Sequence, residues 1–471
     1  MTFPGTVSIA IAAALLAATA SHAESVPLPE SPSRGLTPGT YPEAPPPDTT
    51  PIPPDILARR DQLQIADVLD VALRNDPRTQ IAWRDARAKV DALGAARGDR
   101  WPRLDVTLGA TEAKTAVQGG RFTNRQTTYG PGATLDWLVA DFGERAGTIE
   151  EARRDALAAV WTHGAAVQAT VLTTIEAYVA YVDAKARLTA ARITQDETQT
   201  GLDTAQGRRD AGLATIADVL QAKTALSQAV LDVQTISGAI ASLKGALATR
   251  MGVSPDVTFE VGELPAEVPA VDFGSEVRAQ IDRALASRPD LAAAREAWLS
   301  AKAHVGTTRG SWLPKLSLDG AANRNYYRPE TFVSSIDTWS VGLTLRIPVF
   351  NGLRNKYEIA EAREEEQRAA AEARRVERGV IDDVWQSWTD LETATVRIAT
   401  AKDLLASATQ SEEVALGRYR EGVGTFLDLL SAQSVLARAR AQEISSRADW
   451  FVAAARLLFS TGRLTGPEAL P

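Results

Sequence analysis

The chain repeats itself once, and this internal repeat restricts the possible folds more than any other feature. The two copies keep the same order of segments, so each half should form the same succession of elements. We assign the first repeat to 64–252 and the second to 273–462, with 253–272 as the linker between them. The matching segments are 72–90 with 284–302, 101–110 with 312–321, 137–153 with 347–363, and 212–222 with 422–432.

Each half is predicted to contain one long helical rod. The rods are 143–210 and 353–420, and neither contains a proline. At 1.5 Å per residue, each rod should be about 100 Å long. A shorter helix precedes the strands of each half and another follows the rod, and stacked end to end these two match the rod in length. These shorter helices are expected at 64–100 and 214–251 in the first half, and at 273–310 and 425–461 in the second.

Two short segments in each half alternate between apolar and polar residues. In the first of them, Leu104, Val106 and Leu108 share one face, while Asp105 and Thr107 share the other. This period of two over about ten residues is typical of a membrane β-strand, although a soluble hairpin shows the same alternation. The predicted strands are about 103–112, 128–139, 314–326 and 335–347.

Four strands are too few to close a barrel, and hydrocarbon does not tolerate an open sheet edge. The strands must therefore be shared with copies of the chain if they lie in a membrane. Two copies would give eight strands and a barely filled interior, whereas three would give twelve strands and a lumen. A homotrimer is thus the expected assembly.

The terminal regions are predicted to lie outside this repeat. Residues 1–23 resemble a secretory signal peptide, with an apolar run of signal-peptide length and Ser21-His22-Ala23 as the cleavage site. The alternative is an uncleaved anchor, but the run is shorter than the roughly 20 residues that span a bilayer. We expect a proline-rich tether at 24–63, since 26–54 hold eleven of the 24 prolines, and a tail at 463–471.

Composition excludes several classes of protein. The chain has no cysteine, which excludes disulfides and cysteine-ligated metals, and its net charge of −8 argues against a nucleic-acid binder. The only histidines are His22, His163 and His304, too scattered for a histidine metal site. Without a Cys, His or Ser constellation we expect no catalytic residues, no enzyme activity and no cofactor. Beyond the signal, no run of 18 apolar residues predicts a transmembrane helix.

The order of elements, the rod lengths and two motifs resemble the TolC family of outer-membrane efflux and secretion channels. The motifs are "IPVFNG" at 347–352 and "RYREGVGTFLDLL" at 418–430, and the resemblance covers 64–462. It implies a mostly α protein whose trimer forms a twelve-stranded β-barrel continued by a twelve-helix periplasmic α-barrel. The first half departs from the first motif, with Leu138 and Ala140 at its Pro and Phe positions.

The resemblance also implies a function and partners. The expected function is a passive exit duct in the bacterial outer membrane, for type I protein secretion or multidrug efflux. Its partners would be two further copies, a periplasmic adaptor (membrane fusion) protein, an ABC or proton-driven inner-membrane transporter, and outer-membrane lipid. The alternative is a periplasmic coiled-coil adaptor or structural protein of an export machine, which would explain the helices but not the strands.

Glycines interrupt each half between the rod and its return helix. A glycine there can supply the left-handed residue that ends a helix, and a threonine can cap the next one. A purely structural interpretation is a simple helical turn. The resemblance implies that these tips also dock the adaptor. The predicted tip residues are Gly212, Leu213, Ala214 and Thr215 in the first half, and Gly422, Val423, Gly424 and Thr425 in the second.

A periplasmic gate is expected just beyond the tips. In a trimer Asp428 would occur three times around the axis, and a ring of carboxylates attracts cations; alternatively it is a helix-dipole charge. The resemblance implies one ring only, because Ser431 stands where relatives carry a second Asp. It also implies a hydrogen bond from Tyr419 to Asp218 that holds the closed state, while Gly424 replaces an Arg of that latch.

Overall fold

A computed structural model describes residue 56 and residues 60–117, 122–265, 268, 276–328 and 334–464. All of these belong to one unit of the chain, Thr50–Pro471. The predicted signal peptide at 1–23, most of the tether and the tail beyond 464 lie outside the described residues.

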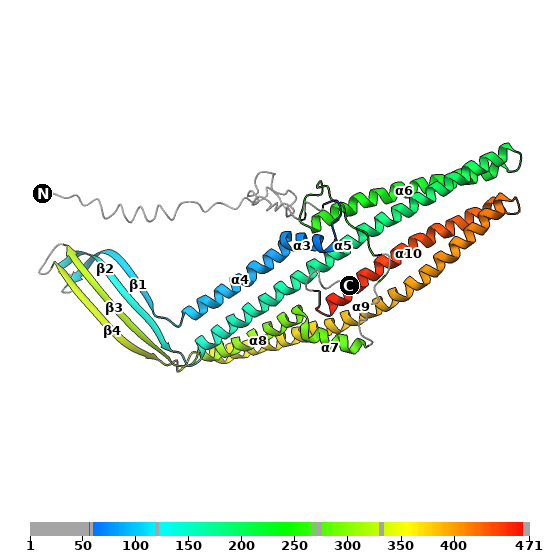
Figure 1. The fold of residues 1–471 in the computed structure, drawn as a ribbon. Coiled ribbons are helices and arrows are strands. Elements are labelled where there is room, and N and C mark those ends of the chain that lie inside the picture. The colour runs from blue at the N-terminus through cyan, green and yellow to red at the C-terminus, as the bar shows by residue number, and fades with distance from the viewer. Residues whose placement is uncertain are drawn as a thin grey trace, which may run out of the picture. The chain divides into compact units, whose positions relative to one another are not determined.

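The two halves contain the same elements in the same order, as the repeat predicts (Figure 1). In each half, two helices lead to a pair of strands, which leads to a 67-residue rod and a 35-residue return helix. The first half comprises α3 (Ile65–Asn75), α4 (Pro77–Gly98), β1 (Arg103–Val117), β2 (Phe122–Ala140), α5 (Glu144–Asp210) and α6 (Ile216–Arg250). The second comprises α7 (Val277–Ser287), α8 (Pro289–Gly310), β3 (Lys315–Arg328), β4 (Ser335–Arg346), α9 (Arg354–Arg420) and α10 (Phe426–Ser460).

The helix expected before each strand pair is in fact two helices, and that prediction was wrong. The break falls at Asp76-Pro77 in the first half and at Arg288-Pro289 in the second. A proline ring clashes with a helical residue before it, and Asp76 and Arg288 are accordingly extended, with ψ of 117° and 123°. Each proline then begins the next helix, where its missing N–H is harmless.

The strands form one antiparallel sheet in the order β1-β2-β3-β4. The pairing of β2 with β3 joins the two halves, with Tyr129 opposite Tyr326 and Ala133 opposite Ala322. Within the described residues, β1 and β4 each pair with one strand only and form the two edges of the sheet. The strands are also longer than predicted at the β1–β2 end.

The helices pack around α5, which contacts α4, α6, α8 and α10. The largest core lies midway along α5, where Ile175 and Tyr181 pack with Leu247 of α6 and Phe259 of the linker. One 18-residue window of α5 has a mean hydropathy of 1.2, but half of it is buried inside the protein, as in a core helix.

The linker and the end of the predicted tether are part of this core. Leu63 pairs with Val261 in a parallel bridge, and both side chains are buried. Glu260 beside them accepts from Lys185 Nζ at 2.8 Å and from Lys244 Nζ at 3.4 Å. Leu63, which we assigned to the tether, therefore packs in the core of the first repeat.

The exits from the sheet place their positive φ values at matching repeat positions but differ in the side-chain cap. Before α9, Gly352 and Leu353 both have a positive φ, of 71° and 65°. Before α5, the positive φ values fall on Phe142 and Gly143, and the Asp141 carboxylate accepts from Gly143 N and Arg145 N. A turn with two positive φ values thus precedes both rods, and in the first half the Asp141 side chain also caps the rod.

Candidate functional site: the two hairpin tips

The tips at 212–215 and 422–425 have the same backbone. Gly212 and Gly422 both have φ of 77°, a conformation that glycine adopts without strain. In the first tip, Leu213 N donates to Arg208 O at 2.7 Å; in the second, Val423 N donates to Arg418 O at 3.0 Å. These bonds satisfy carbonyls at the end of each rod in a Schellman motif. The predicted turns are therefore confirmed.

Each return helix begins with a capping box. Asp218 N donates to Thr215 Oγ1 at 3.2 Å, while Thr215 N donates to Asp218 Oδ2 at 2.8 Å. The same reciprocal bonds join Thr425 and Asp428, at 3.1 and 3.2 Å. Each box satisfies two backbone donors that a helix start would otherwise leave unpaired.

The capping box also sets the charge of Asp428. Hydrogen bonds from the hydroxyl and the backbone N–H of Thr425, together with the charge of Arg418, lower the pKa of Asp428. The carboxylate is solvent-exposed and is ionised at neutral pH. Ser431 is also exposed, one turn further along α10. The start of this helix therefore presents the Asp428 carboxylate alone, and its place in a gate stays a prediction.

Both tips expose apolar side chains, but the next turn of helix differs between them. Leu213 is 69% exposed and Val423 is 68% exposed. Ile216, the first residue of α6, is 58% exposed, whereas its counterpart Phe426 is 3% exposed. Phe426 packs against Tyr419, Leu429, Val219 and Leu202 in a small core shared by both hairpins.

Arg208 of the first rod reaches across to the end of the second. Its Nη1 donates to Tyr419 O at 2.9 Å and to Arg420 O at 3.2 Å, two carbonyls at the C-terminus of α9. Its guanidinium carbon lies 4.9 Å from the centroid of the Tyr419 ring. A cation is favoured both by the negative end of a helix and by the face of an aromatic ring. We call this contact the tip clasp.

The expected hydrogen bond between Tyr419 and Asp218 is not formed, and that prediction was wrong for this structure. Tyr419 Oη is buried without a hydrogen-bond partner among the described residues, and burial raises the pKa of Tyr419. The Asp218 carboxylate instead accepts from Thr215 N and Thr215 Oγ1, at 2.8 and 2.9 Å. The cap of its own helix holds this carboxylate.

Gly424 fits closely against the end of α9. A Cβ at this position would lie 3.1 Å from Arg418 Cβ and 3.3 Å from Tyr419 N, tighter than ordinary contacts. Gly424 N also donates to Arg418 O at 3.0 Å. Sequence reasoning noted that an Arg of the family latch is missing here but did not identify Arg208. The available signal was that Arg208 and Arg418 occupy matching repeat positions, each four residues before the turn glycine.

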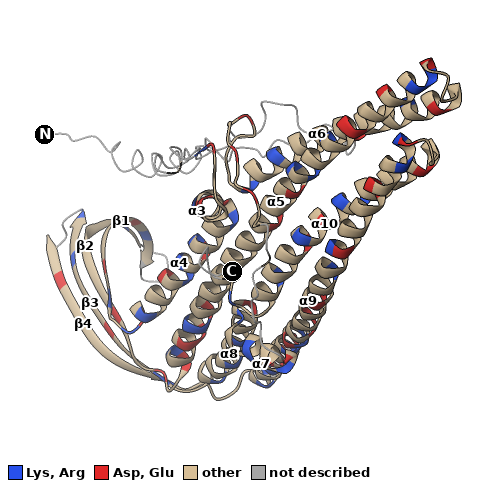
Figure 2. Cartoon of the chain, turned by 45° about the vertical axis from the view of Figure 1, so that its right-hand side comes forward, with Lys and Arg blue, Asp and Glu red and all other residues tan. Residues whose placement is uncertain are grey.

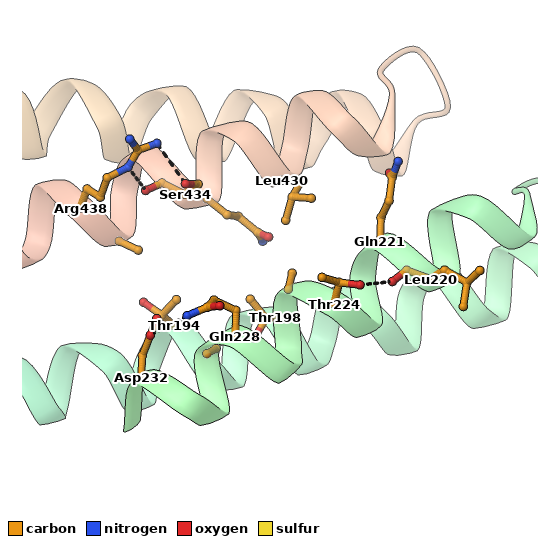
Figure 3. A pocket seen from close by; sticks show the side chains of 14 residues that line it. Thr194, Thr198, Leu220, Gln221, Thr224, Gln228, Asp232, Leu430, Ser434 and Arg438 are labelled. Carbon is orange, nitrogen blue, oxygen red and sulfur yellow. Dashed lines mark hydrogen bonds between the residues drawn. The ribbon is translucent and has the colours of Figure 1, made fainter. Parts of the chain in front are cut away.

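A groove separates the two return helices behind the tips (Figure 3). It has a volume of about 650 Å³, with Thr224, Gln228 and Asp232 of α6 on one wall and Ser434 and Arg438 of α10 on the other. Polar bonds within each wall hold these side chains in place, including Arg438 Nη2 to Ser434 Oγ at 3.1 Å. Over this stretch a groove therefore lies between the two return helices.

Beyond the groove, ion pairs join the first rod to α10. Arg440 donates to both carboxylate oxygens of Glu197 at 2.8 Å, and Arg456 Nε donates to Glu176 at 2.9 Å. Figure 2 shows charges of both signs distributed along these helices. Among the described residues, no group of three or more His, Asp or Glu side chains could hold a metal ion.

Comparisons with known proteins agree with this geometry. A model of the outer membrane efflux protein family matches residues 68–253 and 280–463, one segment in each repeat. The chain is 28% identical over 423 residues to Protein CyaE of Bordetella pertussis, covering 90% of this chain and 88% of that protein. It is also 28% identical over 268 residues to the outer membrane efflux protein BepC of Brucella suis, covering 56% of this chain and 57% of BepC.

Solved structures support the fold. The outer membrane protein VceC of Vibrio cholerae superposes with a TM-score of 0.76 at 20% identity, over 84% of this chain and 96% of VceC. A periplasmic adaptor, the alternative that the sequence left open, does not account for the family match or the sheet. The family is one of efflux ducts rather than enzymes. The chain belongs to the outer membrane efflux protein family, and it is a TolC-like export channel of the bacterial outer membrane.

Proposed function

We propose that three copies of this chain assemble into a passive duct that carries substrate from a periplasmic entrance to the outside. The observation that carries this proposal is the four-stranded sheet with an exposed apolar face, whose edge strands β1 and β4 have one partner each in the described chain. Bilayer hydrocarbon requires those edges to be paired. Three copies supply twelve strands, enough to surround a lumen.

The rods supply the periplasmic path. Each has 67 residues and runs from the sheet to a tip, a length of about 100 Å. Six rods and their shorter companion helices would continue the lumen away from the membrane. We infer that an inner-membrane transporter, either an ABC protein or a proton-driven pump, drives transport through this path.

A periplasmic adaptor would dock at the tips. Leu213 and Val423 project from the two turns, and Ile216 and Leu427 add exposed apolar surface beside them. A helical partner that covers these side chains would remove apolar area from water, at about 25 cal/mol for each Å². The names of the relatives CyaE and BepC state no cargo; we propose export without assigning the cargo.

The assembly can be tested with introduced cysteines, because the natural chain has none. Thr107→Cys on β1 would be combined in turn with Thr338→Cys, Ser340→Cys or Gly342→Cys on β4. Oxidation should convert at least one pair into a covalent trimer on a denaturing gel, and each single variant is the control. A chain that fractionates as a soluble monomer, or that forms only covalent dimers, contradicts the trimeric duct.

We further propose that the tips form the gate, with Asp428 as a single ring of carboxylates. Replacing Asp428 by Ala or Asn should lower the cation preference of a single channel, because three negative charges leave the constriction. Asp218→Asn is the matched control, since it alters the same capping box in the other tip. Unchanged ion selectivity in the Asp428 variants would show that Asp428 does not lie in the constriction.

A further inference from the structure

The strand register separates the sheet into two chemically different faces. Leu104, Val106 and Leu108 of β1 lie on the same face as Val341 and Trp339 of β4, and all five are exposed. The opposite face carries Arg103, Asp105, Asp136, Asp319 and Arg346. In an outer-membrane channel the apolar face is the one that contacts lipid. We call it the lipid face.

Two tyrosines mark the end of this apolar band that lies away from the helices. Tyr129 and Tyr326 are opposite each other on β2 and β3, and their rings stack with centroids 5.5 Å apart. Both side chains fall on the lipid face. Tyr129 lies two residues further from the helices than Pro131 of β2, and Tyr326 lies two residues further from the helices than Arg324 of β3. Tyrosine prefers the level at which acyl chains meet headgroups. The headgroups of the outer leaflet should therefore lie at or just beyond these rings.

Cations follow the tyrosines on the same face. Arg328 lies two residues beyond Tyr326 on β3, and its guanidinium carbon is 5.9 Å from the Tyr129 ring centroid. Lys114 and Arg125 are directly opposite each other on β1 and β2, further towards the strand ends. All three side chains are exposed.

The carboxylates on this part of the lipid face are already occupied. Glu112 pairs with Arg125, and Asp337 accepts from Arg324 Nε at 2.6 Å and from Arg324 Nη2 at 2.7 Å. Within the described chain, no carboxylate pairs with Lys114 or Arg328. Counted over the described residues, the face therefore carries two uncompensated positive charges where headgroups are expected. Exposed cations alone bind a free anion weakly, but acyl chains on the apolar band would hold a lipid headgroup beside them.

We propose that Lys114 and Arg328 bind the phosphate groups of lipid headgroups in the outer leaflet, next to the Tyr129–Tyr326 pair. Arg328 can offer two parallel donors to a phosphate, and Lys114 adds a compact charge. Three copies in a trimer would provide three such sites around the sheet. The lipid would then fix the depth of the strands in the membrane. The site rests on the outer-membrane location and is independent of what passes through the lumen.

Native mass spectrometry of the full-length assembly in detergent tests this site. The probe is bisphosphorylated lipid A, compared with the same lipid after enzymatic removal of both phosphates. A cation near an anionic lipid surface contributes about a fivefold gain in binding, so Lys114→Ala combined with Arg328→Ala should weaken binding about 25-fold. Removing the phosphates should have a similar effect on the natural protein, and inorganic phosphate should not compete.

The matched control is Arg103→Ala combined with Arg346→Ala, which removes the same charge from the same sheet but from the other face. It should bind the phosphorylated lipid like the natural protein. Circular dichroism and the oligomer on an unheated gel show that each variant is folded. Equal binding by the Lys114/Arg328 variant, an equal loss in the control, or equal binding of both lipid forms would overturn the proposal.

Discussion

The first tip and the second tip have the same turn and the same cap but different surroundings. Gly212 and Gly422 have identical φ values, and both return helices begin with a Thr-x-x-Asp capping box. Yet Arg208 of the first hairpin donates to carbonyls of the second, and Phe426 of the second is buried where Ile216 of the first is exposed. A duplicated sequence thus specifies a local structure twice and a tertiary contact only once.

From this asymmetry we infer that the two tips have different roles. Both tips share the tip clasp and a buried core, but the first tip provides the arginine and keeps more apolar surface in contact with solvent. Movement of one hairpin relative to the other must break the clasp. The first tip is therefore the better candidate for docking and the second for the gate.

The largest difference is expected from truncating the first apolar residue of each return helix. Phe426→Ala should destabilise the second tip by about 3–5 kcal/mol, because it empties a buried site against Tyr419 and Leu429. Ile216→Ala should change the stability of the first tip by no more than about 0.5 kcal/mol, as exposed sites do. Hydrogen exchange of the tip amides measures both. Similar losses of stability at the two tips would contradict the difference in packing between them.

The tip clasp should give the next largest effect. Arg208→Ala removes two hydrogen bonds from a charged donor and a cation–π contact, and should loosen the tips by about 1.5–3 kcal/mol. Single-channel conductance should rise as the hairpins separate. The control is Arg209→Ala, an exposed neighbour. If conductance and amide protection are unchanged in Arg208→Ala, the clasp does not hold the two hairpins together.

Truncating the threonine caps should lower the stability of both tips equally, in contrast to the unequal losses expected for Phe426 and Ile216. Thr215→Ala and Thr425→Ala each remove a side-chain acceptor at a helix start and should cost about 1 kcal/mol apiece. Thr→Ser at either position should restore most of that loss, because the hydroxyl is retained. Local stability from hydrogen exchange provides the measurement. A cost several times larger at one tip would show that its cap also holds tertiary contacts.

The smallest effect is the pH dependence of the second cap. The folded-state pKa of Asp428 is lowered, so its contribution is present above the unfolded pKa of about 4 and is lost as the pH falls through the lower folded value. Thr425→Ala removes the largest cause and should raise the pKa of Asp428 towards its ordinary value. NMR titration of this carboxylate follows the shift. A pKa that does not change would assign the lowering to the backbone N–H of residue 425 and to Arg418 instead.

Much of the fold follows from local patterns in the sequence. The glycine turns, the threonine caps and the alternation of Leu104, Val106 and Leu108 each depend on residues a few positions apart. The break at Asp76-Pro77 was also available from the sequence, since the residue before a proline disfavours the helix, but the long helical pattern concealed it. The gate bond between Tyr419 and Asp218 depended on resemblance, and here the cap of α6 holds the carboxylate.

By itself, the sequence determined the repeat, the rod lengths, the turns and caps, and which side chains share a face of each strand. Only the tertiary structure decided that β2 pairs with β3 across the halves, that Arg208 meets the carbonyls of Tyr419 and Arg420, and that Phe426 is buried while Ile216 is not. The physical reason is the separation along the chain of the residues that interact. Turns, caps and strand faces arise from neighbours along the chain, whereas packing between rods depends on helices that are 200 residues apart in sequence, where two equal motifs meet unequal surroundings.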